Sequence, residues 1–249
     1  MDYQDINSET IDRWVEEGWI WGIPIDHETF VRAQNGEYDI LLTPTKPIPH
    51  EWFGDLKGKK VLGLASGGGQ QMPILTALGA HCTCLDYSKK QLESEAFVAK
   101  REGYEIELVR ADMTKPFPFA DESFDLILYP VSNCYIEDVH PVWRECFRVL
   151  KKGGRILSGL DIGTNYLVDE DEERIVNSLP FNPLHNPEQL QQLIDQDCGI
   201  QFSHTLEDQI QGQLAAGFTL KALFEDYNEE GRLEKMRIPS FIATLSMKN

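Results

Sequence analysis

Three loops of the sequence carry side chains that could together bind a nucleoside. The first is the segment 64–70, Leu-Ala-Ser-Gly-Gly-Gly-Gln, whose consecutive glycines let the backbone approach a ligand closely. The second holds Asp86, whose carboxylate could accept two hydrogen bonds from a ribose diol. The third holds Asp112 and Met113, which could accept from an adenine amine and pack on its ring. Each loop taken alone is also compatible with a simple turn, so the prediction depends on the three lying together.

Two phosphate-binding motifs are absent from the first loop. No Gly-Lys-Ser or Gly-Lys-Thr follows the glycines, which excludes a Walker loop. The dinucleotide pattern of three spaced glycines also fails, because counting from Gly67 places Met72 at the third glycine position. A nicotinamide dinucleotide is therefore disfavoured as the ligand.

Polar residues after the fourth and fifth predicted strands are candidates for binding or activating a second substrate. Tyr129, Asn133 and Tyr135 belong to the segment Tyr-Pro-Val-Ser-Asn-Cys-Tyr, and Asp161 follows the fifth strand. Asp161 could act as a base, but a solvated turn acid is the favoured interpretation. For the other three, a structural loop is an equal alternative, so no catalytic residue is assigned beyond these four candidates.

Histidine and cysteine give little support for other chemistry. His140, His185 and His204 could titrate near neutrality, but a surface or capping role is favoured for each. Cys82 and Cys84 share one strand face without a second cysteine pair, which predicts buried apolar residues and no metal site. The 5 cysteines, an odd number, come without a secretory leader, so we expect reduced thiols and a cytoplasmic protein.

Short apolar runs alternate with helical patterns through most of the chain. Strands are expected at 60–64, 81–85, 104–108, 124–128, 155–160, 220–224 and 241–247, and helices at 72–78, 88–102, 139–150 and 205–216. In the second helix, Ser88 and Gln91 have capping-box spacing, and Leu92, Ala96 and Ala99 are expected on one buried face. The alternation predicts a doubly wound α/β fold with a mainly parallel seven-stranded sheet and helices on both faces. Ligands bind such a sheet at the carboxyl ends of its strands, where the three loops must meet.

Size and charge limit the remaining possibilities. The 249 residues predict one larger domain, and the net charge of −18 argues against nucleic acid and anionic membrane surfaces as partners. No apolar run is long enough to span a membrane. We expect an aromatic-rich helical extension at 1–57, a main domain at 58–249, and within it an insertion at 163–204 that covers the substrate. Lys46 in the extension could pair with a ligand carboxylate. Oligomeric state is open.

The segment from about 56 to 160 resembles the class I S-adenosylmethionine-dependent methyltransferases. The glycine loop, Asp86 in Leu-Asp-Tyr-Ser, Asp112, the run 117–127 and the helix and turn at 142–157 carry the likeness. The family's first loop usually begins with an acid and continues with three spaced glycines. Here Gly63 stands at the acid and Ala65 at the first glycine, while Gly67 and Gly69 match.

The resemblance implies S-adenosylmethionine as cofactor and in-line methyl transfer to a small-molecule acceptor, which depends largely on positioning. The cofactor site it implies comprises Ala65, Gly67, Gly69, Asp86, Tyr87, Asp112, Met113 and Pro130. Alternatives are a cofactor-binding regulator or scaffold without turnover, a nicotinamide-dependent oxidoreductase, and a protein or nucleic-acid methyltransferase.

Overall fold

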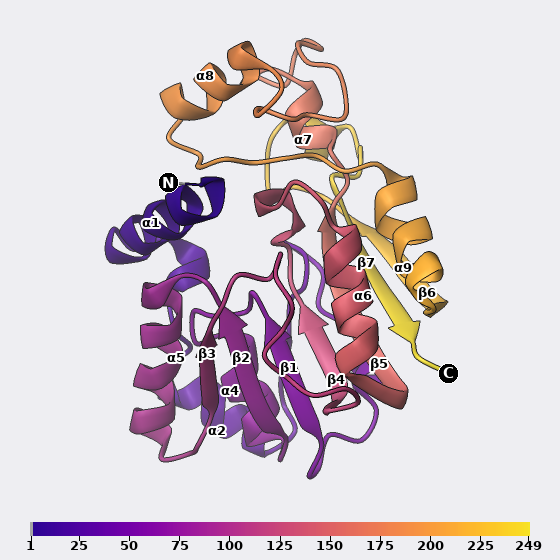
Figure 1. Cartoon of the computed structure of the whole chain (residues 1–249). Helices are drawn as coiled ribbons and strands as arrows, with labels where there is room; N and C mark the ends of the chain where they lie inside the picture. Colours follow the sequence, from indigo (N-terminus) through magenta and orange to yellow (C-terminus); the bar gives the residue numbers. More distant parts are fainter. Residues whose placement is uncertain (1) are drawn as a thin grey trace.

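The computed structural model describes residues 2–249 as one seven-stranded sheet with helices on both faces (Figure 1). The strand order is β3-β2-β1-β4-β5-β7-β6, and β7 alone runs antiparallel to its two neighbours in this described part. The predicted doubly wound, mainly parallel α/β fold is therefore confirmed. The strands are β1 (Lys60–Leu64), β2 (His81–Asp86), β3 (Glu107–Arg110), β4 (Phe124–Tyr129), β5 (Leu150–Asp161), β6 (Thr219–Asp226) and β7 (Phe241–Met247).

Two apolar cores hold the helices to the sheet. Successive residues of a strand point to opposite faces, so Val61 belongs to one core and Leu62 to the other. The first core contains Met72 and Leu75 of α4 (Gln71–Ala77), and the second contains Trp143 of α6 (His140–Val149). The helix predicted at 139–150 ends one residue earlier, at Val149, and the fifth strand begins at Leu150 and not at residue 155. The reason is that Leu150 pairs with Phe124 of β4. The third strand begins at Glu107, since the pairing with β2 begins there and not at residue 104.

Helix α5 (Lys89–Glu102) begins and ends as predicted. The Ser88 hydroxyl accepts from the Gln91 backbone N–H at 3.1 Å, and Gly103 ends the helix with φ of +74°. The predicted buried face was wrong by one position, because Ala96 is exposed and Glu95 is buried. The 205–216 helix is split into a π-helical turn η3 (Glu207–Gln211) and α9 (Gly212–Ala216).

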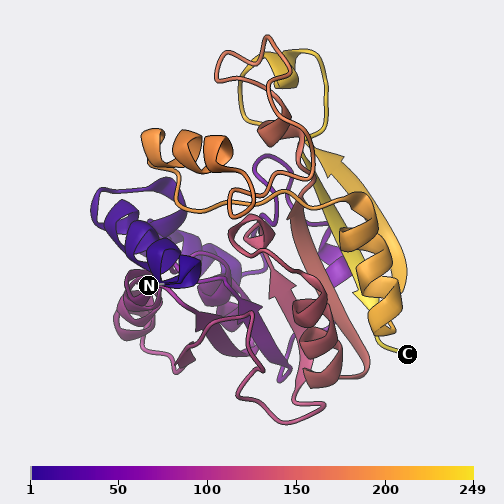
Figure 2. The same ribbon diagram turned by 45° about the horizontal axis from the view of Figure 1, so that its top comes forward.

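Helix α1 (Tyr3–Glu16) of the extension and the 163–204 insertion lie over the carboxyl ends of the strands (Figures 1 and 2). Helix α2 (His27–Gln34) of the extension packs instead against α4 on one face of the sheet. The extension comprises α1 (Tyr3–Glu16), η1 (Ile20–Gly22), α2 (His27–Gln34) and α3 (His50–Phe53). The side chains of Leu42 and Trp52 in the extension are buried in the first core, together with Val61 of β1. The insertion holds α7 (Thr164–Leu167) and α8 (Pro187–Asp195), and the remaining short elements are η2 (Asn133–Tyr135) and α10 (Arg232–Lys235). None of the helices in residues 2–249 is long and apolar enough to cross a membrane.

Candidate active site

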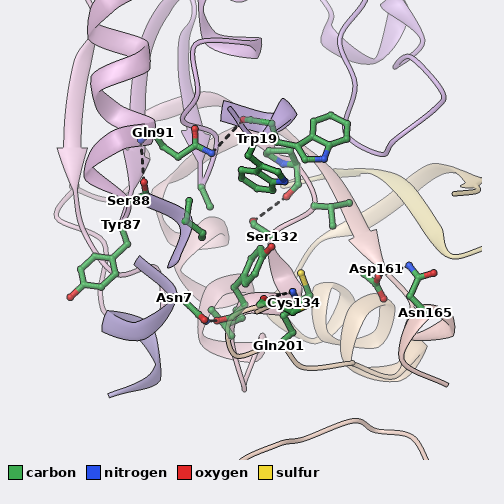
Figure 3. A pocket seen from close by; sticks show the side chains of 18 of the residues that line it. Asn7, Trp19, Tyr87, Ser88, Gln91, Ser132, Cys134, Asp161, Asn165 and Gln201 are labelled. Atoms are coloured by element: carbon green, nitrogen blue, oxygen red, sulfur yellow. Dashed lines mark hydrogen bonds between the residues drawn. The ribbon is translucent and has the colours of Figure 1, made fainter. Parts of the chain in front are cut away.

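A cavity of about 530 Å³ lies at the carboxyl end of the sheet. Its walls come from the loops after β1, β2, β3, β4 and β5, from the extension and from the insertion. Figure 3 shows Tyr87, Ser88 and Gln91 at one end of it and Asp161 and Asn165 at the other. The crevice expected from the loop positions is therefore present, and it is one continuous cavity.

The glycine loop is shaped by close contacts with neighbouring backbone and side chains. A Cβ at Gly67 would lie 2.5 Å from the Cβ of Gln91 and 2.9 Å from Oδ2 of Asp86. A Cβ at Gly68 would lie 2.6 Å from the carbonyl oxygen of Trp21, and its φ is +96°. Ala65 adopts a φ of +46°, which is left-handed for a residue with a side chain. Ala65 and Gly67 line the cavity, so this backbone forms one of its walls.

The Asp86 carboxylate holds the loop in place. Oδ2 accepts from the Gly67 N–H at 3.0 Å and Oδ1 accepts from the Ser88 N–H at 2.9 Å. Burial raises the pKa of Asp86 to about 6, against the opposing effect of these backbone hydrogen bonds. Asp86 also lines the cavity. It is therefore both a wall of the cavity and a support of the glycine loop.

Other residues predicted for the nucleoside end also lie in the wall. Tyr87, Asp112, Met113 and Pro130 all line the cavity. Asp112 accepts from the backbone N–H and the hydroxyl of Thr114, at 2.8 and 2.9 Å. Its orientation is thus set by its own turn, with the carboxylate still at the cavity wall.

Gly69 does not line the cavity but forms part of the support behind it. Its N–H donates to Oε1 of Glu95 at 2.9 Å. Glu95 is fully buried, and its Oε2 has no hydrogen-bond partner within residues 2–249. Burial raises the pKa of this carboxyl to about 8; the Gly69 hydrogen bond opposes the rise and the Asp86 charge adds to it. The sequence analysis missed Glu95, because a glutamate in a helix usually faces solvent.

Of the candidates after β4, Tyr135 lines the cavity while Tyr129 and Asn133 do not. Tyr129 is fully buried and packs edge-on against Trp143 on the α6 face, 5.7 Å between ring centroids. The Asn133 amide exchanges two hydrogen bonds with the backbone of Asp161, at 3.1 and 3.2 Å. The Nε2–H of His204 in turn donates to the carbonyl oxygens of Asn133 and Ile136, at 3.0 and 2.9 Å. Tyr129, Asn133 and His204 therefore hold the loop after β4 in place and do not line the cavity.

Asp161 lies at the end of β5 with its carboxylate at the cavity wall. The backbone N–H of Gly163 donates to Oδ1 at 2.6 Å, and the Asn165 amide donates to Oδ2 at 3.3 Å. Burial raises the pKa of Asp161 to about 6, opposed by these two hydrogen bonds. A buried carboxylate with such a pKa could exchange a proton near neutrality.

Helix α1 closes the cavity, which the sequence alone did not predict. The Asn7 side chain donates to the Ile200 carbonyl and accepts from its N–H, at 2.9 and 2.7 Å. The Ser8 hydroxyl donates to the carbonyl of Tyr87 at 2.9 Å. Trp19 and Trp21 complete this side of the wall. The extension is thus joined to both the insertion and the β2 loop of its own chain, a link that depends on contacts up to 193 residues apart in sequence.

Cys82 and Cys84 are buried, as the sequence predicts. Cys134 lines the cavity, but burial raises the pKa of its thiol, which makes it a poor nucleophile at neutral pH. No group of three His, Cys, Asp or Glu side chains in residues 2–249 is placed to hold a metal ion. Lys46 lies outside the cavity, where its ammonium donates to the carbonyl of Glu225.

The residues at the Asp86 end fit S-adenosylmethionine. The glycine backbone allows close approach, and carboxylates are present for a ribose diol and an adenine amine. The buried Oε1 of Gln91, which lines the cavity, has no partner within the described chain and is a free acceptor. The donor and acceptor set therefore suits a neutral adenosine with a cationic sulfonium attached.

Comparison with known proteins identifies the family. A model of the methyltransferase domain matches residues 62–158. The uncharacterized methyltransferase YbaJ of Bacillus subtilis (strain 168) is 40% identical over 249 residues, which covers 97% of this chain and 97% of that protein.

Solved structures show the same fold. An S-adenosylmethionine-dependent methyltransferase from Mesorhizobium loti matches with a TM-score of 0.63 and 17% identity, over 79% of this chain and 94% of that one. The 1,6-didemethyltoxoflavin-N1-methyltransferase of Burkholderia thailandensis, solved with 1,6-didemethyltoxoflavin and S-adenosylhomocysteine, has a TM-score of 0.62 and 14% identity, over 99% of this chain and 89% of that one. Since the similarity to YbaJ runs through nearly the whole of both chains, this chain belongs to the class I S-adenosylmethionine-dependent methyltransferases.

Proposed function

We propose that this enzyme methylates a small molecule that binds between the glycine loop and the insertion. The observation that carries the proposal is the single cavity shared by the Asp86 end and the Asp161 end. Helix α1 and the 163–204 segment both contribute to its wall, so an acceptor in it would contact protein on both sides. A concave site of about 530 Å³ suits a cofactor and a small acceptor better than a folded protein or a duplex.

The cofactor would supply a methyl group on a sulfonium, and the side chains of the protein would hold the cofactor and the acceptor in position. Asp86, Asp112 and Met113 would hold the adenosine, with Asp86 toward the ribose and the other two at the adenine. Tyr87 and Pro130 would form the adjoining walls. The aromatic side chains Trp19 and Trp21 would exclude water from the reacting atoms, which strengthens electrostatic interactions there. Alignment of the acceptor with the methyl group then lowers the barrier through orientation.

Two further observations support a small acceptor. The Burkholderia thailandensis enzyme with the same fold is solved with a small heterocyclic molecule, 1,6-didemethyltoxoflavin. The net charge of −18 also disfavours nucleic acid as a substrate, because phosphate contacts need basic side chains. Membership of the methyltransferase family leaves the oxidoreductase and the scaffold without a supporting observation.

Calorimetric titration with S-adenosylmethionine and with S-adenosylhomocysteine tests the cofactor half of this proposal. We expect both to bind at one site per chain, and Gly67→Ala to abolish the binding through the contact with Gln91. A metabolite screen that follows S-adenosylhomocysteine release then tests the acceptor half. Turnover with a protein or nucleic-acid fraction, and with no metabolite fraction, would contradict a small acceptor.

A further inference from the structure

The charged side chains that line the cavity are all acidic. Among the lining residues of the described chain there is no lysine, arginine or histidine. Carboxylates, in contrast, lie at both ends of the cavity. The carboxylates of the wall are Asp86, Asp112, Asp161, Asp169, Glu170 and Glu172.

Most of these carboxylates already have other partners. Asp169 accepts from the backbone N–H groups of Glu173 and Arg174, and Glu172 accepts from the Leu233 N–H at 2.6 Å. Glu170 is exposed. Asp161 is the buried carboxylate of this half, and it has no ion pair in residues 2–249.

The groups that face Asp161 are neutral. Its hydrogen bonds come from the Gly163 N–H and the Asn165 amide. The titratable groups near enough to feel its charge are the Cys134 thiol and the phenols of Tyr135 and Tyr166, and the pKa of each is raised by burial above its ordinary value. A buried carboxylate without a cation is costly, and a bound cation would remove that cost.

Aromatic rings complete the surroundings of this carboxylate. Tyr166 and Phe181 both line the cavity, and their ring centroids are 5.2 Å apart. The Tyr166 hydroxyl is turned to Gln201, to which it donates at 2.7 Å. An alkylammonium ion near Asp161 is favoured by the carboxylate and by aromatic faces, whereas a carboxylate or phosphate group at the same place would find no cationic side chain in the wall.

From this arrangement we propose that the methyl acceptor is an amine, bound with its nitrogen at Asp161, and that the Asp161 carboxylate takes the proton that this nitrogen must lose. The inference rests on the proposed function. In the reaction the ammonium gives a proton to Asp161, and the freed nitrogen lone pair attacks the methyl carbon. The carbon–sulfur bond breaks with its electron pair on sulfur. The products are the methylated ammonium and the neutral thioether S-adenosylhomocysteine.

Binding of matched amines and carboxylates to the protein loaded with S-adenosylhomocysteine tests this inference. The probes are butylamine, benzylamine and tryptamine against butyrate, benzoate and indole-3-acetate, measured by calorimetry at pH 7.5. We expect at least one amine to bind at least about tenfold more tightly than its matched acid, because only the amine can pair with Asp161. Asp161→Asn should remove this preference. Asp171→Asn is the matched control, since Asp171 is an exposed acid of the same insertion outside the cavity wall.

The outcomes separate this inference from the proposed function. If S-adenosylhomocysteine binds but every amine binds no better than its acid, the amine acceptor is wrong and the cofactor site stands. A preference that survives Asp161→Asn also overturns it. If S-adenosylhomocysteine does not bind, the proposed function and this inference fail together.

If the Asp161→Asn variant does not fold, the pH dependence of amine binding to the wild-type protein provides a second test. Affinity for the preferred amine should fall when the pH is lowered from 7.5 to 5, as the Asp161 carboxyl with its pKa of about 6 becomes protonated. An affinity that does not change over this range would overturn the pairing. Where the amine is methylated, Asp161→Asn should lower kcat and remove the acidic limb of its pH profile. An unchanged kcat would exclude Asp161 as proton acceptor.

Discussion

The buried carboxyl of Glu95 should make the stability of the fold decrease between pH 7 and 8. Its pKa is about 8 in the folded chain, compared with an ordinary value of 4.5. Between these two values the folded state binds the proton and the unfolded state does not. The stabilisation from this proton is therefore complete below the unfolded pKa and is lost as the pH rises through the folded pKa.

The size of the effect follows from the two pKa values. Protonation of the folded state falls from about nine tenths at pH 7 to about one half at pH 8, which reduces the free energy of unfolding by about 1 kcal/mol. Asp86 lies near Glu95, but its pKa of about 6 leaves it ionised in this window. Cys82, Cys84 and Tyr104 also face Glu95, and burial raises the pKa of each above the window.

Urea unfolding of the wild type and of Glu95→Gln at pH 7 and at pH 8 measures this effect. Glutamine has the shape of the protonated acid and keeps an oxygen for the Gly69 N–H, so its contribution does not depend on pH. Subtracting the two proteins cancels the thiols and histidines that they share. We expect the wild type to lose about 1 kcal/mol more than the variant over this interval. If both lose the same amount, Glu95 is not protonated in the folded protein and the reasoning is wrong.

Three further substitutions test the site. Asp86→Ala should weaken S-adenosylhomocysteine binding by at least about 2 kcal/mol in calorimetry, through lost charge-assisted hydrogen bonds; unchanged affinity in a folded variant would remove Asp86 from the site. Gly67→Ala should abolish the same binding, whereas Gly103→Ala, at a left-handed helix end with open space around it, should lower only the melting temperature, by the equivalent of about 1 kcal/mol; equal effects on binding would contradict the close-contact argument. Asn133→Ala should cost about 1–3 kcal/mol in urea unfolding, because the backbone of Asp161 loses two buried partners; a stability change near zero would show that water replaces the amide.

The sheet could be predicted because most of its strands are short segments rich in apolar residues that alternate with helical patterns along the chain. The ends of β3 and β5 could not, because strand pairing sets them. Residues 104–106 alternate as a strand should but have no partner on β2, and Leu150 continues a helical pattern yet pairs with Phe124. The local sequence does not determine which strand will pair with it in the folded sheet.

The residues of the candidate site could be predicted only where an aspartate lies at or just after the end of a strand. Asp86 and Asp161 are the last residues of β2 and β5, and Asp112 comes two residues after β3; the order of a parallel sheet brings all three to one edge. Asn7 could not be found in this way, because its partner Ile200 is 193 residues distant in sequence. The 1–57 segment was expected only as an aromatic-rich helical extension, because the side chains that close the site depend on contacts made only in the folded chain.

Gly63, at the position where the family usually has an acid, packs against Met72, and two other acids support the glycine loop. A Cβ at Gly63 would lie 2.6 Å from the sulfur of Met72, which fills the space of a side chain there. The amides of Gly67 and Gly69 then receive their acceptors from the opposite direction, from Asp86 at the end of β2 and Glu95 on α5. Both of these acids are buried without an ion pair, and burial raises the pKa of each; three backbone hydrogen bonds oppose the rise at Asp86, but only one opposes it at Glu95. The order of the glycine loop thus depends on two carboxyls that titrate within reach of neutral pH, so cofactor affinity should depend on pH even before an acceptor binds.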